Sequence, residues 1–145
     1  MNKQSLLYLL FSLAIFLSVS ACGSSLILEN VDYSQPIESV LVPNSDQVIH
    51  DQRYAVKFSI APLLAEENLT EIDEIRMIRN RKGYYFLTAS GFNNVYVLTP
   101  GVSTLELVEK LFITENGLSQ PAFNQRESYI ELVDRNSGET FNLNY

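Results

Sequence analysis

The chain has 145 residues, of which 46% are hydrophobic and 19% are charged, and its formal net charge is −7. This length allows one domain, and the acidic balance disfavours nucleic-acid binding, because neutralising phosphates requires a surplus of Lys and Arg. A single Cys and a single His exclude an intramolecular disulfide framework and the usual zinc-binding sets.

The N-terminus predicts a segment that directs the chain into a membrane. Lys3 precedes an apolar stretch over residues 6–17, which suits a secretory signal but is shorter than the roughly 20 apolar residues of a permanent span. The stretch is followed by Val19, Ser20, Ala21 and Cys22. This branched residue, two small residues and cysteine resemble the lipobox of bacterial lipoproteins, and the resemblance covers residues 1–22 only.

The resemblance implies that Val19, Ser20 and Ala21 fit the signal peptidase, and that Cys22 becomes the acylated N-terminus, carrying chains such as palmitate. Several buried acyl chains hold a protein firmly at a membrane. In such lipoproteins Asp after the cysteine favours the inner membrane, so Gly23 implies the outer membrane. The alternatives are an ordinary secretory signal cut near Ala21 and an uncleaved anchor.

Removal of the signal peptide, residues 1–21, changes the net charge to −8 because only Lys3 is lost. The expected mature protein has a lipidated Cys22 and short tether over residues 22–25, followed by one β-rich domain over residues 26–145. Residues 23–25 reach roughly 10 Å when extended. The tether would therefore hold the domain against the membrane.

The first part of this domain predicts short strands and one ambiguous segment. Residues 26–33 and 37–42 read as extended pieces, which Pro36 and Pro43 restrict to edge strands or an arm. Strict alternation over residues 54–60 predicts a strand with one apolar face. Residues near 64–73 predict one short helix, because Leu69, Ile72 and Ile75 fit one helical face, or else a long acidic loop.

From residue 74 onward, strands alternate with tight turns. The strands are expected at residues 75–80, 84–89, 95–99, 105–113, 129–133 and 140–145, with an irregular stretch around Pro121. The apolar residues Leu105, Leu107, Leu111 and Ile113 are expected to share one face of their strand. Frequent turns without intervening long helices predict a mainly β fold: a single antiparallel β-sandwich or small barrel built from consecutive hairpins.

Basic residues cluster at the first hairpin of this region. Arg76, Arg79, Arg81 and Lys82 lie within seven positions, and strand alternation places Arg79 and Arg81 on one face and Arg76 on the other. Such a cluster is a candidate docking patch for anionic headgroups, a glycan or an acidic partner. The alternative is ion pairing with the neighbouring acids, which contributes little at a surface.

Aromatic residues concentrate on the same hairpins. Tyr84, Tyr85, Phe92 and Tyr96 could form an exposed contact surface that stacks on sugar rings or anchors a protein partner. Packing in the core is the alternative.

The chain carries no recognisable catalytic or metal-binding set. His50, the single histidine, is predicted to lie in a loop, and Cys22 would be consumed by lipidation. The acids between residues 66 and 74 are predicted to form a solvated face rather than a calcium site. Asp134 and Asn136 are predicted to bond their own backbone in a turn before Gly138. We therefore expect no catalytic residue, metal or cofactor.

Together these patterns predict a non-catalytic accessory or interaction module, anchored in the outer membrane through its N-terminal lipid, with an envelope protein as its partner. A lipoprotein that binds a glycan or small ligand is the alternative. A glycoside-cleaving enzyme is less favoured. So is a small outer-membrane β-barrel: Phe141, Leu143 and Tyr145 resemble its terminal strand signal, but the strands are short for a span.

Overall fold

The computed structural model describes residues 37–145. Four predicted lipobox residues, Val19, Ser20, Ala21 and Cys22, lie outside the described residues, as do the tether and the strand expected over residues 26–33. Within the described part, antiparallel sheets of consecutive hairpins and one short helix confirm the prediction of a mainly β fold.

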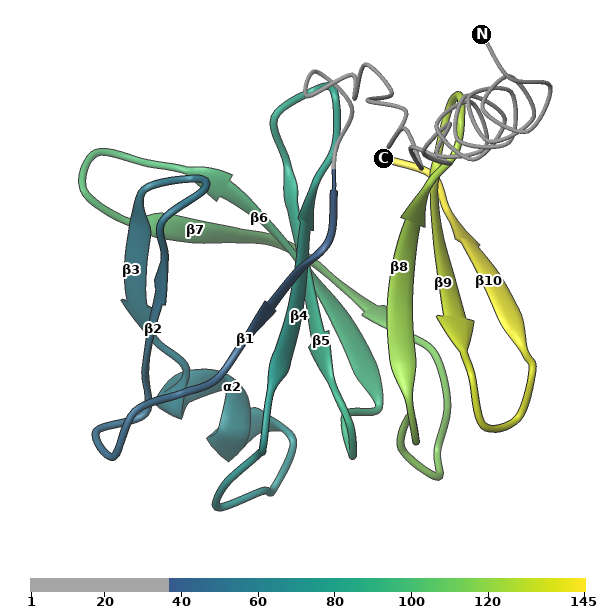
Figure 1. Ribbon diagram of the computed structural model, residues 1–145, viewed down its shortest axis with the longest axis horizontal. Helices are drawn as coiled ribbons and strands as arrows, with labels where there is room; N and C mark the ends of the chain where they lie inside the picture. Colours follow the sequence, from purple (N-terminus) through teal and green to yellow (C-terminus); the bar gives the residue numbers. More distant parts are fainter. Residues whose placement is uncertain (1–36) are drawn as a thin grey trace, which may run out of the picture. The chain divides into compact units, whose positions relative to one another are not determined.

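A five-stranded antiparallel sheet forms the middle of the fold (Figure 1). Its strand order is β1-β4-β5-β6-β7. The strands are β1 (Ser39–Leu41), β4 (Ile75–Arg79), β5 (Tyr85–Ala89), β6 (Asn94–Pro100) and β7 (Leu105–Phe112). Four of them follow one another along the chain, because tight turns join antiparallel neighbours directly. In the β4–β5 turn Gly83 adopts a φ of +97°, a conformation that glycine reaches without steric cost.

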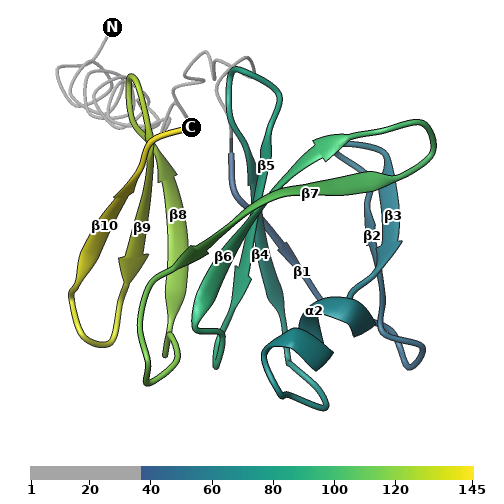
Figure 2. The same ribbon diagram turned by 180° about the vertical axis from the view of Figure 1, so that it is seen from behind.

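Each face of the central sheet is covered by another layer, as Figures 1 and 2 show from opposite sides. One face carries the hairpin of β2 (Val48–Asp51) and β3 (Val56–Ser59), followed by helix α2 (Ala61–Glu66). The other face carries a three-stranded sheet of order β10-β9-β8. Its strands are β8 (Pro121–Gln125), β9 (Ile130–Asp134) and β10 (Thr140–Leu143). All five residues of β5 are buried, since both of its faces are covered.

The alternation of side chains along the central strands creates two separate cores. Tyr85 and Leu87 of β5 pack with Ile49 of β2 and with α2 in the first core. Phe86, which points the other way, packs in the second core with residues of the three-stranded sheet such as Leu132. Successive side chains of a strand point to opposite faces, so one strand supplies both cores.

A β-bulge interrupts β7. The register between β6 and β7 shifts between Val97 and Leu98, which leaves Val108 without a partner of its own on β6. The extra residue reverses the alternation beyond it. Leu105 therefore packs in the first core and Leu111 in the second. The prediction that the apolar residues of this strand share one face was wrong for this reason.

Three further expectations differ from the structure. The helix spans Ala61–Glu66 rather than residues 64–73, and it accommodates Pro62 because a helix leaves the first N–H groups unbonded in any case. His50 lies on strand β2 and is exposed, so its assignment to a loop was wrong. The stretch read as irregular contains β8, which begins at Pro121, a position where a strand tolerates proline.

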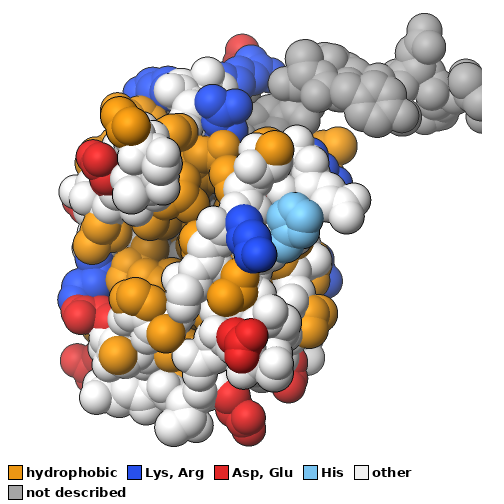
Figure 3. Space-filling model, turned by 90° about the vertical axis from the view of Figure 1, so that its left-hand side faces the viewer, with side chains coloured by type: hydrophobic (Ala, Val, Ile, Leu, Met, Phe, Trp, Pro, Cys, Tyr) orange, Lys and Arg blue, Asp and Glu red, His pale blue; other side chains and the backbone are white. Residues whose placement is uncertain are grey.

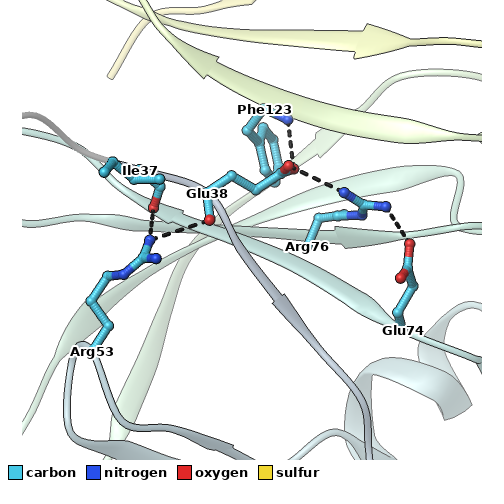
Figure 4. Close-up of polar contacts among 6 residues, drawn as sticks. All are labelled: Ile37, Glu38, Arg53, Glu74, Arg76 and Phe123. Carbon is cyan, nitrogen blue, oxygen red and sulfur yellow. Dashed lines mark hydrogen bonds and ion pairs between the residues drawn. The ribbon is translucent and has the colours of Figure 1, made fainter. Parts of the chain in front are cut away.

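A partly buried carboxylate joins two layers (Figure 4). Glu38, next to β1, accepts a hydrogen bond from the backbone N–H of Phe123 in β8 at 2.7 Å, and another from Arg76 Nη1 in β4 at 3.2 Å. Arg76 also pairs with Glu74. The start of β1 is thereby bound to both the central sheet and the three-stranded sheet.

Candidate functional site

A groove separates the β2–β3 hairpin and α2 from the strands β6 and β7. It has a volume of about 380 Å³, within the range of small-molecule sites. Figure 3 shows this side of the molecule as a hollow with hydrophobic side chains in its wall. The aliphatic and aromatic lining residues include Phe58, Leu63, Leu98, Leu105 and Leu107.

The groove exists because two strand edges face each other without pairing. Among the described strands, β3 pairs only with β2, and β7 pairs only with β6. The bulge at Val108 places Lys110 on the same face of β7 as Leu105 and Leu107, and all three line the groove. We name this feature the β3–β7 groove.

A second hollow extends the groove toward the β6–β7 turn. It has a volume of about 570 Å³ and is lined by residues 55–58 and by Pro100, Gly101 and residues 103–105. Phe58 and Leu105 line both hollows, so the two are adjacent. Val102, at the tip of the turn, is 94% exposed and lines neither hollow.

Polar groups in the groove are few. Lys110 Nζ forms an ion pair with the Glu66 carboxylate, and because both side chains are about half exposed, the pair lies at the mouth of the groove. Ser59 contributes a hydroxyl. The Tyr96 hydroxyl donates to Glu67 at 2.7 Å and is therefore already bonded. The groove thus combines apolar walls with one cation and one anion at its opening.

Glu67 lies beneath the groove as a buried anchor. Its carboxylate accepts hydrogen bonds from the Asn93 backbone N–H at 2.7 Å, from Asn94 Nδ2 at 2.8 Å and from the Tyr96 hydroxyl. Burial raises the pKa of Tyr96 well above its usual range, and the bond to Glu67 raises this pKa further. The acids between residues 66 and 74 were predicted to form a solvated face. This prediction was wrong for Glu67, whose carboxylate links the end of α2 to the start of β6.

The structure divides the predicted basic patch. Arg76 is held in its pairs with Glu38 and Glu74 between the layers, so it is not available for docking. Arg79 places its guanidinium 5.5 Å from the centre of the Tyr85 ring. Arg81 and Lys82 are exposed at the β4–β5 turn, and neither forms an ion pair with another described residue.

The predicted aromatic contact surface is mostly core. Tyr85, Phe92 and Tyr96 are buried, so of the two interpretations of these residues, packing in the core is the correct one for these three. The cause is the layer formed by the β2–β3 hairpin and α2, which removes from solvent the face that a single-layer hairpin would expose. Tyr84 is partly exposed and packs edge-on against Tyr145, with ring centres 4.6 Å apart.

Asp134 behaves as the sequence predicts, with an additional role. It accepts the backbone N–H of Asn136 at 3.0 Å, and it also accepts those of Ser119 at 2.7 Å and Gln120 at 3.1 Å from the preceding loop. Burial raises the pKa of Asp134, but these donors lower it by more, so the resulting pKa lies below its usual range. The turn is therefore fastened to the segment before β8.

Residues 37–145 contain no group of three His, Cys, Asp or Glu side chains that could hold a metal ion. No helix within this same range is both long and apolar enough to span a membrane. Comparisons with protein families, with curated proteins and with solved structures find no match to this chain. Function is therefore inferred from the groove and from the charges on the surface.

Proposed function

We propose that this chain is a lipid-anchored, non-catalytic protein of the bacterial cell envelope, and that its β3–β7 groove binds a single apolar chain with an anionic end, such as a fatty acid. The groove carries this proposal: both walls are apolar, and Lys110 places one cation at the mouth. The lipobox pattern ending in Cys22 supports the anchor.

The chemistry of the walls favours an acyl chain over a sugar. A sugar requires several fixed donors and acceptors, whereas the groove offers the hydroxyl of Ser59 and an ion pair at its edge. An acyl chain requires none, and each buried methylene contributes about 0.8 kcal/mol. A ligand carboxylate could replace Glu66 beside Lys110 at low cost, because an exposed ion pair is worth at most about 1 kcal/mol.

Binding of a dansyl-labelled fatty acid to the purified protein tests the groove. Leu107→Trp fills the groove from a side chain that is already 57% exposed, so the fold should tolerate it. We expect this variant to bind at least about tenfold more weakly, a loss of roughly 1.4 kcal/mol. Val102→Trp, on the same hairpin but outside the groove, is the matched control and should bind like the wild type. Equal binding by both variants would refute the proposal.

The anchor is tested separately by Cys22→Ala. We expect the wild type to fractionate with membranes and the variant to lose most of this association, because the acyl chains are attached through the thiol. A variant that stays fully membrane-bound would contradict the lipid anchor without bearing on the groove.

A second function is favoured by the free edge of β7. An exposed edge strand can accept a strand from a partner protein, and Leu107, Val108 and Phe112 are exposed along this one. A photo-crosslinker at Phe112 should then capture a defined partner, and Val108→Lys should abolish the capture while leaving fatty-acid binding unchanged. Failure of Val108→Lys to affect capture would exclude pairing at this edge.

A further inference from the structure

We infer that one end of the domain is a docking surface for anionic lipid headgroups, an inference that rests on the proposed lipid anchor. This end, here named the tether end, comprises Ile37, the β4–β5 turn (residues 80–84) and the β8–β9 turn (residues 126–129). It combines the point where the chain enters the fold, a concentration of cations and a hollow lined by tyrosines.

The strand register places the start of the described chain at this end. Ser39 lies opposite Met77 in the antiparallel pair of β1 and β4, and continuing this register brings Ile37 level with Arg79, next to the β4–β5 turn. Arg53 of the β2–β3 turn donates to the Ile37 carbonyl at 2.8 Å (Figure 4). The connection to Cys22 therefore leaves the fold from the tether end.

The charges of the domain are divided between its two ends. Five of the nine Lys and Arg residues in the described range lie at or beside the tether end: Arg53, Arg79, Arg81, Lys82 and Arg126. The opposite end, with the loop after α2 and the β9–β10 turn, carries mostly acids, including Glu71, Asp73, Glu74 and Glu139. Figure 3 shows this separation on one face, with Lys and Arg gathered at the top and Asp and Glu toward the bottom.

Arg81 and Lys82 are the residues best placed to contact headgroups. Arg126 is paired with Glu131, whereas Arg81 and Lys82 form no ion pair with any residue in the described range and line a hollow of about 250 Å³. Tyr129 and Tyr145 line the same hollow, together with one exposed acid, Glu127. Tyrosine rings suit the boundary between water and lipid, and Lys and Arg near an anionic leaflet are attracted to it.

The position of the chain's exit favours a lipid surface over an acidic protein. Fourteen residues lie between Cys22 and Ile37, and this segment spans at most about 50 Å when extended, so the tether end is the part of the domain that the anchor keeps nearest to the bilayer. The acidic end would be repelled by anionic lipids. Both effects orient the domain in the same direction.

The orientation can be measured on the lipidated protein in vesicles. Cys22 is the only cysteine and would carry the lipid, so Ser128→Cys at the tether end and Ser137→Cys at the opposite end each introduce a unique site for a fluorophore. Vesicles contain phosphatidylcholine, with or without phosphatidylglycerol, and a nitroxide-labelled lipid as quencher. We expect stronger quenching at position 128 than at position 137, and an increase at position 128 when phosphatidylglycerol is added.

Arg81→Ala with Lys82→Ala should reduce the ratio of docked to undocked protein by about fivefold for each cation removed, or about 25-fold for both. Arg135→Ala, an exposed arginine in the β9–β10 turn, is the matched control and should leave quenching unchanged. Equal quenching at the two labelled positions would overturn the inference, as would quenching at position 128 that requires an added envelope extract instead of phosphatidylglycerol. Protein that does not float with vesicles would overturn the anchor as well, whereas a failed fatty-acid assay would affect only the groove.

Discussion

Tyr96→Phe removes one hydroxyl from the buried Glu67 network and leaves the ring in place. The Tyr96 side chain is buried, and its hydroxyl is one of three donors to the Glu67 carboxylate. A hydrogen bond to a charged group contributes about 1.5–3 kcal/mol. We therefore expect the free energy of unfolding to fall by about 1.5–3 kcal/mol, which corresponds to a decrease in Tm of about 6–12 °C for a domain of this length.

Urea unfolding of the wild type, Tyr96→Phe, Glu67→Gln and the double variant measures this interaction. We expect unchanged m-values, since the same surface is exposed on unfolding. The effect of Tyr96→Phe should be smaller in the Glu67→Gln background, because the charged acceptor is then absent. Tyr54→Phe is the control: its hydroxyl bonds the Ile37 carbonyl at 3.2 Å in an exposed setting, so its loss should cost less than about 0.5 kcal/mol.

Two results would refute this reasoning. A Tyr96→Phe variant within about 0.5 kcal/mol of the wild type would show that the hydroxyl contributes no more than an exposed one. Additive single effects in the double variant would show that Tyr96 and Glu67 do not interact, whatever each contributes alone.

Three further predictions concern the stability of the fold. Glu38→Ala should lower the free energy of unfolding by about 2–3 kcal/mol in urea titrations, because it leaves the Phe123 N–H and the Arg76 guanidinium without their shared acceptor; an unchanged midpoint would contradict this. The lowered pKa of Asp134 stabilises the folded state above the unfolded-state pKa, and this contribution is lost as the pH falls through the folded-state pKa. The stability difference between the wild type and Asp134→Asn should therefore shrink as the pH falls from about 5 toward 2, and a constant difference would exclude the linkage. Gly117→Ala should cost about 1–3 kcal/mol in thermal unfolding, since φ is +73° and the added Cβ would lie 3.0 Å from a backbone oxygen; a variant as stable as the wild type would argue against this turn geometry.

Local pattern was sufficient to identify most strands. Residues 75–80 and 84–89 are rich in apolar side chains and flank a glycine-containing turn, and the structure places β4 and β5 there. Strand β8 escaped prediction because it begins with Pro121 and ends in polar residues, Asn124 and Gln125, so that it resembles a loop. It becomes a strand through pairing with β9, which the local sequence does not specify.

The groove could not be predicted for a related reason. Its wall on β7 depends on the bulge at Val108, which places Lys110 on the same face as Leu105 and Leu107. Strict alternation along the strand would place Lys110 on the other face from Leu107. Lys110 was nevertheless a signal, as the one cation on this strand, but its partner Glu66 comes from α2, 44 positions away in the chain.

The sequence by itself determined the mainly β character of this domain, its turns and the lipobox resemblance at Cys22, because these depend on residue type and on spacing between neighbours. Tertiary structure decided which side chains face solvent. It buried Tyr85 and Tyr96 by covering both faces of one sheet, turned Glu67 inward toward three donors, and separated Arg76 from Arg81 and Lys82. Burial depends on what packs against a strand from elsewhere in the chain, and alternation records only that two faces differ.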